Sequence, residues 1–425
     1  EVLYELGCDP TMDGAQLGKI ICDTYAMGCR EIDQEDEITL SVTNLQQVQP
    51  LLDAYESLGR EALTKAAADG RFFAKLGRSA GRAENYGGNT DDQGYTDMVD
   101  LGDLVRNSQD LLEGGARNLL DALEACVVYR VNGAYCGQAT GLSCYYPYSG
   151  DWDGAAVYAG LGSNPSMAYL YEYALSGNLS QDGYAYLSQE GETIQAAAPV
   201  ESGEDYALED HPLYVDDDGN AVLDIGPDAA ALLQGVYFNL CYVDEETDSI
   251  LMLGYDNDID ADWDAGIFRD NFRGVWGCLD GVLCYTELIY EGEDYNLYSV
   301  PILLNGEKYQ LRVAYRYDSG EFQILGARQG IGDNGMADRN LRTLQPGDQV
   351  TALHYMLSIS GDNREPELYQ GQTITVTENT AFAEEDLGDG TFVLSFDMVD
   401  QRGESYASEL AWFTVEDGTI YTSAE

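Results

Sequence analysis

Cysteine and histidine are the residues of this chain that could form a nucleophile with its base, and their positions do not favour such a pair. Cys8, Cys22 or Cys144 could act as a nucleophile only with an imidazole within hydrogen-bond distance. His211 lies in an acidic segment and His354 lies within a pattern typical of a strand. We therefore assign no catalytic residue from the sequence. A carboxylate pair of the glycosidase kind stays open among 76 acidic residues, since no particular pair stands out.

Aspartates at alternate positions in DNDIDADWD form the pattern that could bind a metal ion. The run places Asp256, Asp258, Asp260 and Asp262 two residues apart, and Asp264 follows. Hard cations prefer several carboxylate and carbonyl oxygens, so calcium is the predicted ion. The run lacks the glycine and the glutamate that an EF-hand loop requires. A solvated loop between strands is the alternative interpretation.

A polar segment between two helical patterns is the strongest candidate for a binding site in the first half. Residues 82–104, RAENYGGNTDDQGYTDMVDLGDL, are rich in Gly, Asn, Thr, Tyr and Asp. Large ordered loops on a rigid scaffold often carry binding or catalytic groups. The segment contains no nucleophile paired with a base, so its residue types alone do not define a reaction.

Hydrophobic periodicity predicts the helices and strands that must position this segment. Apolar side chains recur at helical spacing in residues 13–29, 48–66, 111–129 and 166–175. Asp13 is expected to cap the first of these helices, and Pro50 is tolerated in the first turn of the second. Residues 37–45 predict a strand, and residues 141–150 predict a short strand buried on both faces. The alternation indicates an α/β layer with too few strands for a full sheet.

From about residue 212 the apolar pattern changes to a period of two, which predicts antiparallel β structure. Gly, Asn and Asp turns separate the short strands, as at Asn305-Gly306. We expect sandwiches or barrels, divided into a β domain at 212–342 and a second β subdomain at 343–425. Residues 188–211 are predicted to be a solvated acidic linker, a mobile tether between the halves. The predicted fold class is therefore α/β followed by all-β.

The charge of the chain restricts its partners. The chain has 425 residues, of which 76 are acidic and 21 basic, and its net charge is −55. Such a field repels phosphate backbones and anionic bilayers, which disfavours roles at nucleic acid and at membrane surfaces. A halophilic surface is the alternative explanation of the charge. The nine cysteines form no CxxC pair, which argues against a zinc site, and their odd number argues against a disulfide scaffold.

The first residues, EVLYELGCDP, already follow a pattern typical of a helix and its following loop. We find no signal peptide and no apolar run of about eighteen residues that could span a membrane. We therefore expect this chain to be a piece of a longer protein, with further residues upstream of Glu1.

Several segments of the first half resemble the clostripain family of cysteine peptidases. They are DPTMDGAQLGKIICDTYAMGC, ITLSVTNLQQVQPLLDAY, RAENYGGNT with GYTDMVDLGDLV, GLSCYYPYSG and SNPSMAYLYEYALSG, in the family's order and at similar spacing. The match covers roughly residues 1–187. The β half, with YDNDIDADWDAG, DNFRGVWG and VPILLNGEKYQLRV, looks like the C-terminal domain appended to many bacterial members.

The resemblance implies a caspase-like α/β fold in which a His follows one central strand and a nucleophilic Cys, in an Asp-Ala-Cys context, ends the next. The chain contains neither Asp-Ala-Cys nor His-Gly, so both motifs are expected upstream of Glu1 and no catalytic residue is transferred. The resemblance implies a C-terminal portion of a peptidase that is inactive alone and exposes an unpaired sheet edge. Its implied partners are the missing catalytic half and a peptide or protein substrate. Its implied location is the cell surface or the medium.

In this interpretation the loop lines the substrate groove, because loops at strand ends form the site in such sheets. Asn85, Tyr86 and Asn89 would bond to a peptide backbone, and Glu84 or Asp100 would favour a basic side chain. Stabilisation of the loop itself is the alternative role of these residues. The alternative function is a secreted, non-catalytic binding or adhesion protein whose Tyr- and Trp-containing β half carries the binding surface.

Overall fold

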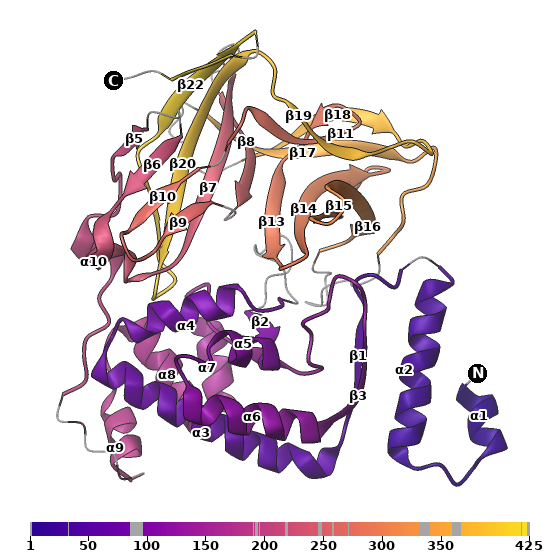
Figure 1. The fold of residues 1–425 in the computed structure, drawn as a ribbon, viewed down its shortest axis with the longest axis vertical. Helices are drawn as coiled ribbons and strands as arrows, with labels where there is room; N and C mark the ends of the chain where they lie inside the picture. The colour runs from indigo at the N-terminus through magenta and orange to yellow at the C-terminus, as the bar shows by residue number, and fades with distance from the viewer. Residues whose placement is uncertain are drawn as a thin grey trace.

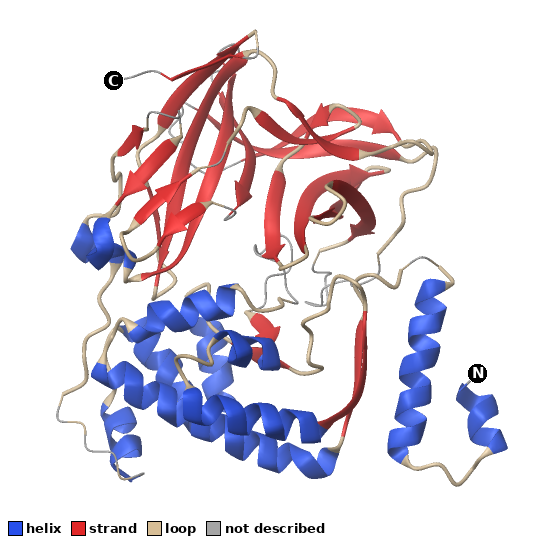
Figure 2. Ribbon diagram, viewed as in Figure 1, coloured by secondary structure: helices blue, strands red, loops and turns tan. Residues whose placement is uncertain are grey.

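A mixed region of helices and small sheets is followed by a largely β region with many strands and a small barrel (Figure 1 and Figure 2). The computed structural model describes residues 2–32, 34–85, 97–189, 191, 194, 196–216, 220–244, 249–256, 259–270, 272–330, 341–358, 367–417 and 419–422. The predicted fold class, α/β followed by all-β, is confirmed at this level of detail.

Nine α-helices are described in the first half of the chain. They are α1 (Val2–Cys8), α2 (Gly14–Arg30), α3 (Val48–Ala68), α4 (Phe72–Gly81), α5 (Leu101–Asn107), α6 (Glu113–Cys126), α7 (Trp152–Leu161), α8 (Pro165–Ser176) and α9 (Gln181–Gln189). Helices α3 to α9 share a core that contains Leu63, Leu119 and Tyr173, and Phe73 meets Tyr173 edge-on at 5.2 Å. None of the described helices is both long and apolar enough to cross a membrane.

Local signals explain where these helices begin and end. Asp13 caps α2, because its side chain accepts from the Gln16 N–H at 2.8 Å while the Gln16 side chain accepts from the Asp13 N–H at 2.9 Å. The helix predicted at 13–29 is therefore confirmed together with its cap. The chain turns sharply between α3 and α4, where a Cβ on Gly70 would lie 2.3 Å from the carbonyl oxygen of Pro199. Only glycine allows this close approach.

The strands of the first half form two separate antiparallel pairs. β1 (Thr39–Thr43) pairs with β3 (Val127–Asn132), and β2 (Met98–Asp100) pairs with β4 (Ser143–Tyr145). The strand predicted at 141–150 is confirmed but shorter, and its burial on both faces is wrong because Ser143 is exposed. Among the described residues, β1 has no strand partner besides β3, and β4 has none besides β2.

The β half contains one large sheet and two smaller ones. Its strands are β5 (Leu213–Val215), β6 (Ala221–Asp224), β7 (Leu233–Asp244), β8 (Ser249–Asp256), β9 (Asp260–Asp262), β10 (Ile267–Arg269), β11 (Val275–Leu279), β12 (Val282–Leu283), β13 (Thr286–Glu291), β14 (Tyr295–Leu304), β15 (Glu307–Arg316), β16 (Glu321–Arg328), β17 (Gln349–Ser358), β18 (Glu367–Thr375), β19 (Phe382–Asp386), β20 (Gly390–Asp400), β21 (Ser405–Ala407), β22 (Ala411–Glu416) and β23 (Thr419–Thr422). A short helix, α10 (Gly226–Ala230), precedes β7. β8, β13, β14 and β17 pair in a closed ring, which makes the small barrel. Because β17 pairs with β8 and β14, the large sheet runs across the predicted boundary at residue 342.

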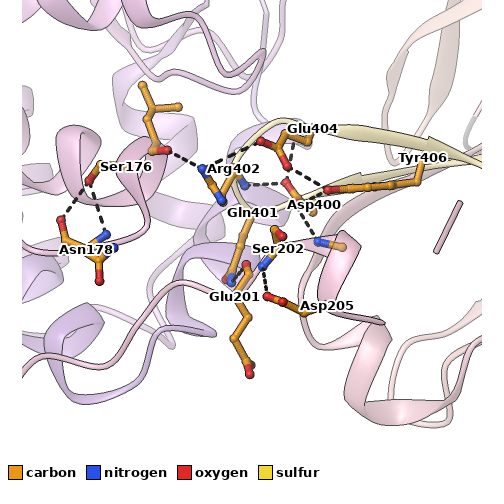
Figure 3. A network of polar contacts seen from close by, with 12 residues as sticks. Ser176, Asn178, Glu201, Ser202, Asp205, Asp400, Gln401, Arg402, Glu404 and Tyr406 are labelled. Carbon is orange, nitrogen blue, oxygen red and sulfur yellow. Dashed lines mark hydrogen bonds and ion pairs between the residues drawn. The ribbon is translucent and has the colours of Figure 1, made fainter. Parts of the chain in front are cut away.

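The predicted linker is attached to both halves, which corrects the expectation of a free tether. Glu204 and Glu209 are solvated as predicted, but Val200 and Leu208 are buried. The Val200 N–H donates to the carbonyl of Gly177 at 2.9 Å, in the helical half. On the other side, a 3₁₀ turn at Gly203–Tyr206 meets the end of β20 (Figure 3). The composition of this segment is acidic and does not reveal the packing, because the packing depends on a few buried apolar residues and on backbone hydrogen bonds.

Candidate functional site

A groove between the helical half and the β half contains the described ends of the loop predicted as a site. Two adjoining pockets form it, and they enclose about 620 Å³ and 1030 Å³ of empty space, part of which is open to solvent. Asn85, Ile289 and Tyr290 line both pockets. We call this feature the interface groove; it lies where α4 and β2 approach β13 (Figure 1).

Hydrogen bonds fix the helical wall of the groove. The Glu84 N–H donates to Asp103 Oδ2 at 2.8 Å, and the Asp100 N–H donates to the Glu84 carbonyl at 2.8 Å. Asp100 caps α5 through the Asp103 N–H at 2.9 Å, and it accepts from the Thr140 N–H and hydroxyl at 2.7 and 2.6 Å. Asp100 is fully buried, so its carboxylate joins two loops and does not face the groove.

Glu84 is one of three acidic groups that line the groove, with Glu37 and Glu291. Glu84 is 5 % exposed, and its Oε2 atom has no hydrogen-bond partner in the described part of the chain. Burial, followed by the charges of Asp103, Asp100 and Glu37, raises the pKa of Glu84 to about 8, while a hydrogen bond with Cys136 opposes the shift. At neutral pH this carboxyl is therefore mainly protonated and can donate a hydrogen bond.

Tyrosines form much of the β wall of the groove. The rings of Tyr237 and Tyr255 stack at 4.6 Å, and the Tyr148 hydroxyl lies 2.8 Å from the Tyr237 hydroxyl. Burial raises the pKa of Tyr237 and raises that of Tyr255 strongly, so both phenols stay neutral. Flat rings with a few hydroxyl groups can contact a peptide or a sugar.

The structure places the predicted loop residues in different surroundings. Glu84 and Asn85 line the groove, and the Asn85 backbone forms an isolated bridge with Val99. Asp100 serves the scaffold beneath the groove. Tyr86 and Asn89 lie outside the described residues.

The described aspartates of the predicted calcium run lie on or beside β9. Asp260 and Asp262 are exposed; Asp260 pairs with Arg269 at 3.4 Å, and Asp262 accepts from the Ala265 N–H at 2.9 Å. The backbone of Asp256 ends β8, and Asp258 lies outside the described residues. Within the described parts of the chain, no group of three or more Cys, His, Asp or Glu side chains could hold a metal ion. Calcium binding stays a prediction.

The thiols and imidazoles are not arranged as a catalytic pair among the described residues. Cys22 and Cys144 are buried, and burial raises the pKa of Cys144 to about 12, which disfavours the thiolate. Cys8 is exposed at the end of α1. His211 Nε2 lies 3.0 Å from the Asp224 carbonyl, and His354 is buried within β17.

Several groove residues come from the β half and were not predicted as site residues. They include Arg312, Tyr290 and Tyr237. Arg312 carried no signal in the sequence, because period-two alternation places it with Gln310 and Arg316, opposite the apolar Leu311 and Val313 of the strand YQLRVAYRY. Its proximity to Glu84 depends on how the two halves pack, which sequence periodicity does not report.

Comparison of the chain with protein-family models, with curated proteins and with solved structures gave no match.

Proposed function

We propose that this chain is the C-terminal portion of a clostripain-like cysteine endopeptidase, and that a segment carrying the catalytic His and Cys completes its first half. The supporting observation is the open edge of β1. Among the described residues β1 pairs only with β3, and a pocket beside it is lined by residues 39–41 of β1 and by residues 141–143 that lead into β4. A caspase-like sheet needs further strands at such an edge, because an exposed edge readily pairs with another strand.

The helices next to β1 also expose apolar surface. α2 packs on the β1–β3 pair, with Cys22 Sγ lying 3.9 Å from the Leu40 carbonyl. Leu3 and Tyr4 of α1 and Ile21 of α2 are nevertheless between 43 % and 85 % exposed. Exposed apolar residues on neighbouring helices are typical of an interaction surface, and the proposed catalytic segment would cover them.

In this proposal the interface groove holds part of the substrate. Glu84 and Asn85 lie on the loop that the resemblance assigns to substrate binding, and Tyr148 and Tyr237 line the adjoining pocket of the groove. The peptide bond itself would be cleaved by the added His and Cys.

The test compares the full product of the gene with this chain alone. The full product is expected to hydrolyse a fluorogenic peptide with Arg or Lys before the cleaved bond, and thiol alkylation should abolish this activity. The chain alone is expected to be inactive. A full product that has no alkylation-sensitive peptidase activity would contradict the proposal.

A pair of matched variants tests the assembly surface. Ile21→Asp in the full product should lower the activity at least about tenfold, because a charge would be buried in the new interface. Ile420→Asp changes an isoleucine of similar exposure in the β half and should leave the activity unchanged. Equal activity of the two variants would count against assembly at α2.

A non-catalytic binding protein is the second candidate, and the tyrosine wall of the groove favours it. In that case the chain alone should bind peptides or glycans, and Tyr237→Ala should abolish binding. Peptidase activity of the full product would decide against this candidate as the main function.

A further inference from the structure

A buried arginine in the interface groove has no partner for its charge among the described residues. Arg312 lies in β15 and is 1 % exposed. Its Nε and Nη1 atoms have no hydrogen-bond partner, and no ion pair forms with it among the described residues. A buried guanidinium without an acceptor is costly, so a group that accepts its hydrogen bonds would stabilise the fold.

This side chain lines the smaller pocket of the groove, together with Glu84 and Glu37. The two carboxyl groups each keep one oxygen, Oε2, without a hydrogen-bond partner. The pocket therefore contains unused donors and unused acceptors that do not reach one another. A ligand with acceptor oxygens could bond to the guanidinium and to a carboxyl that carries a proton.

The charges around the pocket decide which ligand fits. Burial raises the pKa of Glu84 to about 8 and raises the pKa of Glu37, although the charge of Arg328 lowers the latter. Beneath Glu84, Asp103 has its pKa raised to about 6, and Asp100 uses both oxygens for Asp103 and Thr140. Burial also keeps the pocket's Tyr290 neutral, since its pKa is raised. At neutral pH the pocket thus combines the cation of Arg312 with a protonated carboxyl donor.

We propose that this pocket binds a small carboxylate through the guanidinium of Arg312. A guanidinium presents a planar fork that matches the two oxygens of a carboxylate. The protonated Glu84 can add a donor on the other side. A single negative charge suits the site better than a phosphate dianion, since two acidic side chains line the same pocket and the chain carries a net charge of −55. The carboxylate could belong to a free acid or to the C-terminus of a peptide.

The experiment measures acetate binding to the whole chain by calorimetry and by thermal melting, with sodium chloride keeping the ionic strength constant. Wild type should bind acetate saturably, and its melting temperature should rise with acetate concentration. Arg312→Met should lose both effects. Arg269→Met removes a part-exposed arginine of β10 that is paired with Asp260 and lies outside the pocket, so it should keep both effects. The absence of saturable binding by wild type, or equal binding by Arg312→Met, would overturn the proposal.

Two further arms complete the test. A dipeptide with a free C-terminus, compared with its amide, distinguishes a peptide ligand from a free acid. Preference for the free terminus indicates a peptide ligand, and binding of acetate alone indicates a free acid. If Arg312→Met does not fold, Arg312→Lys keeps the charge but loses the planar fork, so its acetate affinity should fall about tenfold. Unchanged affinity of Arg312→Lys would then refute the proposed contact.

Discussion

Glu84 couples the pH of the medium to the stability of the fold. Its pKa is about 8 in the folded chain and 4.5 for an ordinary glutamate. Between these pH values the unfolded chain has lost this proton while the folded chain keeps it. The contribution of Glu84 to the free energy of unfolding therefore falls as the pH rises from about 4.5 to about 8, and it is constant outside this window.

Glu84→Gln should remove this pH dependence, because glutamine resembles the protonated carboxyl and does not titrate. We expect the variant to match wild type near pH 4.5 and to exceed its free energy of unfolding by roughly 4 kcal/mol near pH 8. Urea unfolding at several pH values measures the difference. Glu307→Gln, an exposed change in the β14–β15 turn, is the control and should follow wild type throughout. A Glu84→Gln curve parallel to wild type would show that Glu84 is ionised in the fold.

At the scale of elements, the turn after β20 attaches the linker segment to the β half. Asp400 is fully buried, and its carboxylate accepts from the N–H groups of Gly203, Arg402 and Glu404 at 2.9, 2.8 and 3.1 Å. In Figure 3 Arg402 points toward the helix end at Ser176, and Gln401 points toward Glu201. Gln401 donates to the Glu201 carbonyl at 3.0 Å, and Arg402 donates to the Leu175 carbonyl at 3.2 Å in α8. This turn therefore contacts both the linker segment and the helical half.

Asp400→Ala should destabilise the protein by about 2–4 kcal/mol, since it leaves one buried and two part-buried N–H groups without their acceptor. Protease cleavage near residues 196–211 should become faster at the same time. Asp389→Ala is the control, because Asp389 accepts one backbone hydrogen bond, from Asp417, on an exposed turn. Urea unfolding and limited proteolysis measure both effects; similar losses in the two variants would contradict a special role of the β20 turn.

The sequence predicts elements where the signal is local and fails where distant segments meet. The capping box of Asp13 and the period-two pattern of the β half are local, and both predictions are confirmed. The break at Gly70 depends on the approach of Pro199, from a segment far along the chain. The placing of Arg312 in the same pocket as Glu84 likewise requires the packing of two halves. Of the predicted groove residues, only Glu84 and Asn85 could be placed at the groove.

At the scale of the whole molecule, the net charge of −55 means that acidic side chains repel one another, and salt should screen this repulsion. We expect the melting temperature to rise by about 3–6 °C between low salt and about 0.5 M sodium chloride. A melting temperature independent of sodium chloride would show that the acidic surface does not limit stability.

Calcium chloride at the same ionic strength tests the predicted calcium site. An additional rise in melting temperature, lost in an Asp260→Asn, Asp262→Asn double variant, would support calcium binding.

Tyr135 belongs to the helical half by sequence, but its ring is buried among residues of the β half. It shares a core cluster with Leu297, Ala314 and Leu325, meets Tyr295 edge-on at 4.9 Å, and donates to Gln323 Oε1 at 2.8 Å. The end of the β14–β16 sheet is therefore completed by a residue encoded more than a hundred positions earlier. A gene rearrangement that transferred the β half alone would leave this core open. The two halves can be exchanged between proteins only if the loop of Tyr135 is inherited with its β partner.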